Sequence, residues 1–137
     1  MQSLVLLRND LRLDDNPAMK HAFIQSELIH VLYFYSKKQL KLHNESDLKI
    51  SFLIENLRDL AISLDELNVS LEVIETDGYL NDPEVLLKFF EDNNFDKLFF
   101  NNTFGVDENN RDSKIIKLFK DKNYEFEHFD DQILFKP

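Results

Sequence analysis

The chain has 137 residues, of which 43% are hydrophobic and 12% aromatic, and it contains neither cysteine nor tryptophan. This apolar content excludes a disordered chain, and the lack of cysteine excludes disulfides, thiolate metal sites and a cysteine nucleophile. Sixteen basic and 26 acidic residues give a net charge of −10, which argues against nucleic-acid binding by this chain, because phosphate contacts need basic surface.

Length and hydropathy indicate a single soluble domain that covers residues 1–137. No apolar run approaches the roughly 18–20 residues that a membrane span needs, and Met1–Leu7 lacks the basic start of a signal peptide. We therefore expect a cytoplasmic protein. Gly78 and Gly105 are the only glycines, which excludes the Gly-rich fingerprints of dinucleotide and P-loop sites. The four histidines lack metal-ligand spacing, so no metal site is expected.

The first half of the chain alternates between strand and helix patterns. The predicted elements are a strand at Ser3–Leu7, a helix from Pro17 to about Gln25, a strand at Leu28–Tyr35 and a helix from Asp47 to about Leu67. Proline suits the first turn of a helix, and Asp15 or Asn16 can cap it. The longer helix has a continuous apolar stripe, and its predicted cap is Ser46 or Asn44.

The second half continues the same alternation. The predicted elements are a strand at Ser70–Ile74, a helix from Asp82, a strand at Lys97–Asn101, a helix from about Asp107 to Asp121 and a strand at Tyr124–His128. Five strands separated by four helices predict a Rossmann-like, doubly wound α/β fold: a five-stranded parallel sheet with helices on both faces. The expected strand order is 3-2-1-4-5.

In this order the first and fourth strands lie side by side, and ligands bind such sheets at the carboxyl ends of the strands where the winding reverses. The loops that meet there are residues 8–16 and 101–108, and both are rich in polar side chains. A structural role for these side chains is the simpler interpretation: arginines pair with nearby aspartates, and Asp107 and Glu108 interact with a helix dipole. No histidine or nucleophile lies near this acidic pair in sequence, so spacing alone does not indicate an enzyme.

The stretch from Leu4 to Ala18 resembles the opening motif of the DNA photolyase and cryptochrome family, in which a strand ends in Arg-x-Asp-Leu-Arg-Leu-x-Asp-Asn-x-Ala. Further resemblance lies in Val31–Tyr35, in His43-Asn44, in Asn101–Asp112 and in the closing residues Phe129–Leu134. The similarity covers essentially the whole chain. It implies the amino-terminal antenna domain of a class I photolyase, a deoxyribodipyrimidine photo-lyase that uses light to split cyclobutane pyrimidine dimers in DNA.

In that family a larger helical domain carries FAD, the electron-transfer tryptophans and the basic DNA-binding groove. This chain has no such domain, and catalytic residues are therefore expected outside it. The resemblance implies two partners: the helical FAD-binding domain of the same protein, and damaged DNA through that domain only. The antenna domain itself holds a chromophore and passes its excitation energy to the flavin.

The antenna is commonly a reduced folate, 5,10-methenyltetrahydrofolate. Folate-binding photolyases use a histidine after the second strand and an Asn-Glu pair at the start of the last long helix, and these positions correspond here to His43, Asp107 and Glu108. Asp107 departs from the family's asparagine. Other relatives bind a deazaflavin or flavin deeper at the switch point, where Arg8, Asp10, Asn101 and Phe104 would line the pocket, and some bind no antenna.

Two alternatives to a photolyase domain stay open. In a cryptochrome-type photoreceptor the same domain serves as a scaffold and signalling surface. A free-standing pterin- or nucleotide-binding module would work without any helical domain. An independent hydrolase is disfavoured, because the chain has no phosphate-binding glycine loop and no nucleophile constellation.

Overall fold

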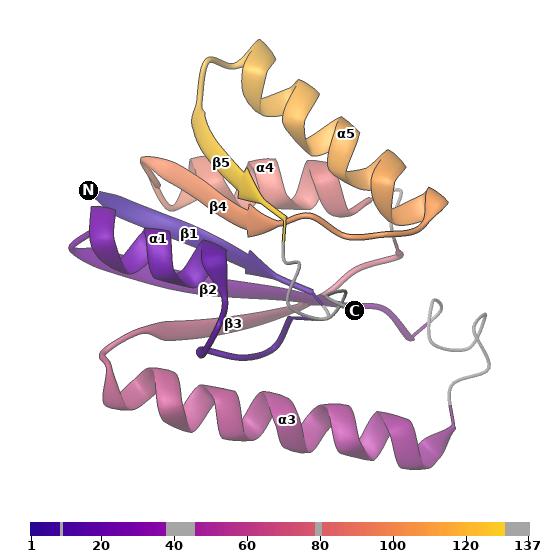
Figure 1. The fold of residues 1–137 in the computed structure, drawn as a ribbon. Coiled ribbons are helices and arrows are strands. Elements are labelled where there is room, and N and C mark those ends of the chain that lie inside the picture. Colours follow the sequence, from indigo (N-terminus) through magenta and orange to yellow (C-terminus); the bar gives the residue numbers. More distant parts are fainter. Residues whose placement is uncertain (9, 38–45, 79–80, 131–137) are drawn as a thin grey trace.

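The computed structural model describes residues 1–8, 10–37, 46–78 and 81–130. Strands and helices alternate along the chain (Figure 1). In chain order they are β1 (Gln2–Leu7), α1 (Pro17–Gln25), β2 (Leu28–Tyr35), α3 (Asp47–Glu66), β3 (Ser70–Glu75), α4 (Asp82–Asp92), β4 (Lys97–Asn101), α5 (Val106–Asp121) and β5 (Glu125–Phe129). The predicted elements are confirmed, with boundaries that shift by at most one residue, such as β5 beginning at Glu125.

The five strands form one parallel sheet in the order β3-β2-β1-β4-β5, as the sequence predicts. The central strand β1 pairs with β2 on one side and with β4 on the other, so the winding reverses between β1 and β4. The edges of the sheet are β3 and β5. The fold class is therefore a doubly wound, Rossmann-like α/β sheet.

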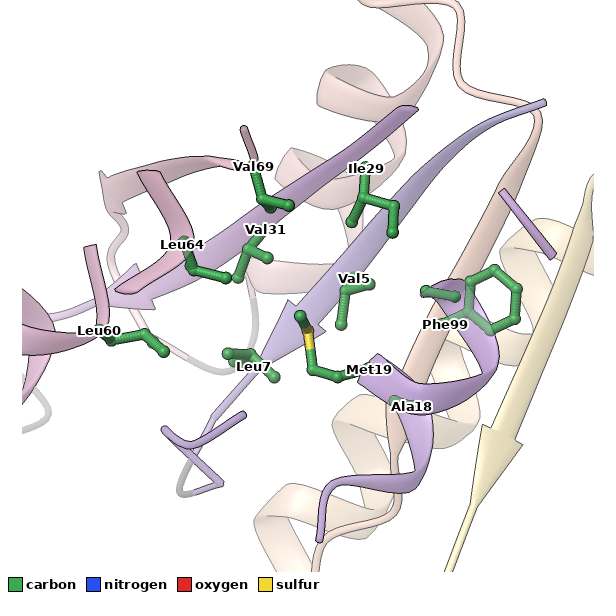
Figure 2. Packing of buried hydrophobic residues seen from close by; sticks show 11 residues of the cluster. Val5, Leu7, Ala18, Met19, Ile29, Val31, Leu60, Leu64, Val69 and Phe99 are labelled. Carbon is green, nitrogen blue, oxygen red and sulfur yellow. The ribbon is translucent and has the colours of Figure 1, made fainter. Parts of the chain in front are cut away.

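Alternate side chains of β1 contribute to two separate hydrophobic cores, one on each face of the sheet. Val5 and Leu7 point toward α1 and α3, where they meet Met19 and Leu64 in a fully buried cluster (Figure 2). Leu4 and Leu6 point the other way, toward α4 and α5, into a cluster rich in phenylalanine. Because both faces of the sheet are covered, its central strands are continuous apolar runs rather than alternating ones.

The N-termini of α1 and α3 are each capped by a polar side chain that the sequence predicts as a cap. Asn16, rather than Asp15, caps α1 by accepting a hydrogen bond from the Met19 amide at 3.2 Å. Ser46 caps α3 by accepting one from the Lys49 amide at 3.1 Å. These bonds satisfy backbone donors that the first helical turn leaves unpaired.

The apolar stripe predicted along α3 is buried only over its second half, at Leu60 and Leu64. Closer to the start of the helix, Ile50 and Leu53 of this stripe are half-buried, and Ile54 is 49% exposed. Figure 1 shows α3 lying alongside β3, and β3 is an edge strand, so the helix has sheet beneath only one side. Periodicity predicts which side chains share a helical face, but the extent of their burial depends on how far the sheet extends beneath the helix.

Candidate functional site

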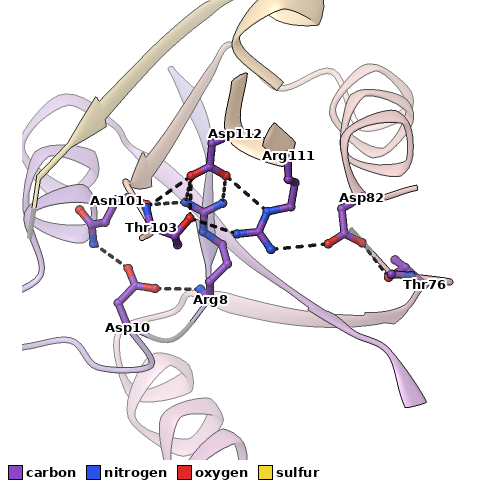
Figure 3. A network of polar contacts seen from close by, with 9 residues as sticks. Arg8, Asp10, Thr76, Asp82, Asn101, Thr103, Arg111 and Asp112 are labelled. Atoms are coloured by element: carbon purple, nitrogen blue, oxygen red, sulfur yellow. Dashed lines mark hydrogen bonds and ion pairs between the residues drawn. The ribbon is translucent and has the colours of Figure 1, made fainter. Parts of the chain in front are cut away.

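Arg8 is the first residue after β1, and its side chain is buried at the carboxyl edge of the sheet. Its guanidinium donates to both carboxylate oxygens of Asp112 on α5, at 2.7 and 3.2 Å, and also to the main-chain oxygen of Asn101 (Figure 3). The guanidinium carbon lies over the Phe100 ring, 5.1 Å from its centre. Arg8 thus links the ends of β1 and β4 to α5.

Asn101, the last residue of β4, connects the two switch-point loops. Its amide nitrogen donates to the carboxylate of Asp10 at 2.6 Å and to Oδ1 of Asn16 at 2.7 Å. Its Oδ1 accepts from the backbone amide of Ala18 at 3.0 Å, while Asp10 also accepts from the backbone amide of Arg8. The expectation that polar residues of the first loop are structural is confirmed for Asn16, but Arg8 pairs with the distant Asp112 rather than with a neighbouring aspartate.

A second buried pair continues this network toward α4. Arg111 lies 3.4 Å from Asp112 through its Nε and 3.8 Å from Asp82 through its Nη1, and Asp82 accepts a hydrogen bond from Thr76 at 2.7 Å. Burial raises the pKa of Asp82, and the bond from Thr76 and the charge of Arg111 oppose that rise without cancelling it.

The pKa of Asp112 shifts in the opposite direction. Burial works to raise its pKa, but the charge of Arg8 and the two hydrogen bonds from Arg8 outweigh burial, so the pKa of Asp112 is lowered. Burial also lowers the pKa of Arg8, which the charge of Asp112 counters. Asp112 is therefore held ionised as the common acceptor of the network.

A pocket of about 300 Å³ lies where the loop after β1 faces β2 and the first half of α3. Three of its lining residues are cationic, namely Arg8, Arg12 and Lys49, and two are aromatic, namely Tyr33 and Phe52. No carboxylate is among the described residues that line it. Nε of Arg8 is buried without a hydrogen-bond partner among the described residues. In a chain of net charge −10, this lining suits an anionic, planar ligand.

Two of the sequence-predicted folate residues, Asp107 and Glu108, lie elsewhere on the same edge. Asp107 and Glu108 form the first turn of α5; Asp107 is exposed and Glu108 is half-buried. The carboxylate of Glu108 packs against Gly105, so closely that a Cβ at Gly105 would overlap it. This is the helix position from which a glutamate reaches back to the start of its helix. His43 lies outside the described residues, so its position relative to this pair is untested.

The residues suggested for a deeper flavin antenna are only partly brought together. Arg8, Asp10 and Asn101 meet in the hydrogen-bonded network, whereas Phe104 is 61% exposed. Sequence reasoning gave no role to several residues of the edge, namely Tyr33, Lys49, Phe52, Arg111 and Asp112. For Asp112 a signal was available: it follows Glu108 by four residues and therefore lies one turn further along the same side of a helix.

Among residues 1–8, 10–37, 46–78 and 81–130, no three histidines or carboxylates are grouped to hold a metal ion. Within the same residues no helix has the length and apolarity to cross a bilayer.

Comparison with known proteins identifies the family. Residues 3–137 match the DNA photolyase family. The chain is 32% identical over 136 residues to the deoxyribodipyrimidine photo-lyase of Buchnera aphidicola from Acyrthosiphon pisum, and 30% identical over 135 residues to that of Escherichia coli K12. Each match covers 98% of this chain but 28% of the relative, so the chain spans little more than a quarter of the length of these curated relatives.

Solved structures of photolyases and a cryptochrome share this fold. An archaeal photolyase from Sulfolobus tokodaii, described with two FAD molecules and a novel light-harvesting cofactor, superposes with a TM-score of 0.79 at 26% identity, over 95% of this chain and 29% of that one. A Synechocystis cryptochrome, with a TM-score of 0.81 and 20% identity over 95% of this chain and 27% of its own, shares the fold. A class III photolyase from Agrobacterium tumefaciens also shares the fold, with a TM-score of 0.73 and 20% identity over 99% of this chain and 27% of its own. The fold therefore does not assign the chain to class I. The chain belongs to the DNA photolyase family and corresponds to the amino-terminal α/β domain of photolyases and cryptochromes.

Proposed function

We propose that this domain binds an antenna chromophore for a class I photolyase that repairs cyclobutane pyrimidine dimers. In this proposal the chromophore absorbs light and transfers excitation energy to FAD in a helical domain outside this chain, and that domain also contacts damaged DNA. The observation that carries the proposal is the polar carboxyl edge of the sheet. A ligand-sized cationic pocket lies there between the loop after β1, β2 and α3, and the acidic first turn of α5 follows β4. Energy transfer requires a chromophore held at a fixed distance and angle, and a buried ionic network provides a rigid support.

The first candidate chromophore is 5,10-methenyltetrahydrofolate. A pterin ring presents an amino group beside a ring nitrogen, and a carboxylate such as Glu108 is a suitable acceptor for these donors. His43 would contact the folate, and Asp107 would supply a second acceptor where folate-binding relatives supply an amide. Two features oppose this choice: the added charge of Asp107, and the contact of Glu108 with Gly105, which folate binding would have to replace.

The second candidate is a flavin-type chromophore in the pocket beside α3. The specific observation in its favour is the pairing of cationic with aromatic side chains there, because a flavin nucleotide offers a planar ring and an anionic phosphate. The unpartnered Nε of Arg8 is a further donor for such a ligand. The Sulfolobus tokodaii photolyase, with its second FAD, is a precedent at 26% identity.

The deciding experiment is to identify the chromophore that co-purifies with the native protein. The protein is isolated from its source in dim light, and released chromophores are identified by absorbance and mass spectrometry. A reduced folate whose retention is lost in Glu108→Ala supports the first candidate. A flavin in excess of one per chain, lost in Lys49→Ala, supports the second. If neither is present and light at antenna wavelengths drives no repair, the antenna proposal is wrong.

A cryptochrome-type photoreceptor is the competing function. A light-dependent assay on DNA that contains cyclobutane pyrimidine dimers separates the two, because a photolyase restores the pyrimidines and a photoreceptor leaves them unchanged. This assay is performed on the native protein, since the catalytic groups are proposed to lie outside residues 1–137.

A further inference from the structure

Thr103 lies in the short connection between β4 and α5 and contacts both inward-facing residues of the second turn of α5. Its hydroxyl donates to Oδ2 of Asp112 at 2.9 Å and accepts from Nη2 of Arg111 at 3.4 Å. Its backbone amide also points to Oδ2 of Asp112, at 3.4 Å. This threonine therefore bridges the loop to the buried ionic network shown in Figure 3.

The N-cap residue of α5 has no side chain with which to hold the start of the helix. Gly105 occupies that position with a φ of 121°, a conformation that glycine adopts without strain, and it gives the helix no side-chain cap. Thr103 stands two residues before Gly105, and Asp112 stands one helical turn beyond Glu108. The bond from Thr103 to Asp112 therefore spans the first turn, from the loop before it to the helical residue beyond it, and Arg8 fixes Asp112.

We propose that Thr103 is a positioning residue: through Asp112 it sets the orientation of the first turn of α5 and therefore of Asp107 and Glu108. The inference rests on the proposed function only for the ligand that these two carboxylates would contact. The geometric part, in which Thr103 orders residues 105–108, holds for any ligand.

The test compares Thr103→Val, which removes the hydroxyl at nearly constant volume, with Thr103→Ser, which keeps it. Ser113→Ala, an exposed change on the same helix, is the matched control. In the native protein, we expect exchange of the Asn109 amide, which donates to the Gly105 carbonyl at 3.0 Å, to be about tenfold faster in Thr103→Val, the effect of one lost hydrogen bond to a charged group. Exchange in Thr103→Ser and in Ser113→Ala should match that of the unsubstituted protein.

The second measurement is the affinity for methenyltetrahydrofolate, which should fall by a similar factor in Thr103→Val and stay unchanged in Thr103→Ser. Unchanged exchange in Thr103→Val overturns the proposal, and so does faster exchange with unchanged folate affinity. If the unsubstituted protein binds no folate, the folate site fails, and amide exchange alone then decides whether Thr103 positions the turn. Should Thr103→Val not fold, Thr103→Ala provides the same comparison.

Discussion

Arg8 and Asp112 are separated by 104 residues in sequence, and they form a two-pronged ion pair in which the residues are only 8% and 6% exposed. The pair joins the first strand of the sheet to its last long helix. Burying two charges costs desolvation energy, which only good geometry and additional hydrogen bonds offset. Asp112 has such bonds from Thr103, and Arg8 has one to the Asn101 carbonyl.

Removal of one partner of this pair should be strongly destabilising. Asp112→Ala leaves the Arg8 guanidinium buried without its counter-charge, and we expect the free energy of unfolding to fall by about 3–5 kcal/mol. Urea denaturation followed by circular dichroism measures it. The control is Lys114→Ala, which breaks the exposed 3.1 Å bridge to Glu84 and should cost less than about 1 kcal/mol. Equal effects of the two variants would contradict a structural role for the buried pair.

The contributions of Asp112 and Asp82 to the free energy of unfolding should change in opposite directions with pH. The lowered pKa of Asp112 contributes stability that is present above the usual value of 3.8 and is lost as the pH falls through the folded-state pKa. The raised pKa of Asp82 has the reverse effect: stability falls as the pH rises from 3.8 through the folded-state pKa. The cost of Asp112→Asn should therefore grow with rising pH, and that of Asp82→Asn should shrink. Unfolding free energies between pH 3 and 7 test both signs.

Gly105 should not tolerate a side chain. Gly105→Ala forces a Cβ into a left-handed conformation and onto the Glu108 carboxylate, and we expect a loss of about 1 kcal/mol or more. The double variant Gly105→Ala, Glu108→Ala relieves the overlap but not the backbone strain, so it should recover part of the loss. Thermal melts of the two single variants and the double variant measure the coupling free energy between positions 105 and 108. If the two destabilisations simply add, the contact between Glu108 and Gly105 is unimportant.

The cationic pocket can be tested by charge reversal. Lys49→Glu should reduce affinity for flavin mononucleotide at least about tenfold, because it places a negative charge beside the ligand phosphate. Lys88→Glu makes the same change in net charge at an exposed position on α4 and should have no effect. Fluorescence quenching of the flavin reports binding. A Lys49→Glu variant that binds normally would remove the pocket from consideration.

The size of the native protein tests the proposed helical partner. An immunoblot of source lysate, with antibody against this domain, should show a band several times larger than 16.3 kDa. A band at 16.3 kDa would instead favour the free-standing pterin- or nucleotide-binding module, and light-driven repair by this chain would be ruled out.

The fold was predictable because its determinants are local. The apolar run at Leu28–Tyr35 and the proline at position 17 mark a strand and a helix start without reference to the rest of the chain. The candidate site was less predictable, because its contacts join distant segments. Asp107 and Glu108 were evident as neighbours in sequence, but the Arg8–Asp112 pair and the approach of Lys49 to Tyr33 depend on how α5 and α3 pack on the sheet. Local patterns do not encode such distances.

The two open edges of the sheet carry acidic side chains. Glu72 and Glu75 lie on β3, and Glu125 lies on β5, where the neighbouring Glu127 is paired with Lys97 of β4. An edge strand with free amides and carbonyls can recruit the same strand of another molecule and begin aggregation. Here such an approach would bring carboxylates against carboxylates, and the mutual repulsion keeps neighbouring molecules apart. Dissolved salt screens this repulsion, so samples should be purified and stored at low ionic strength.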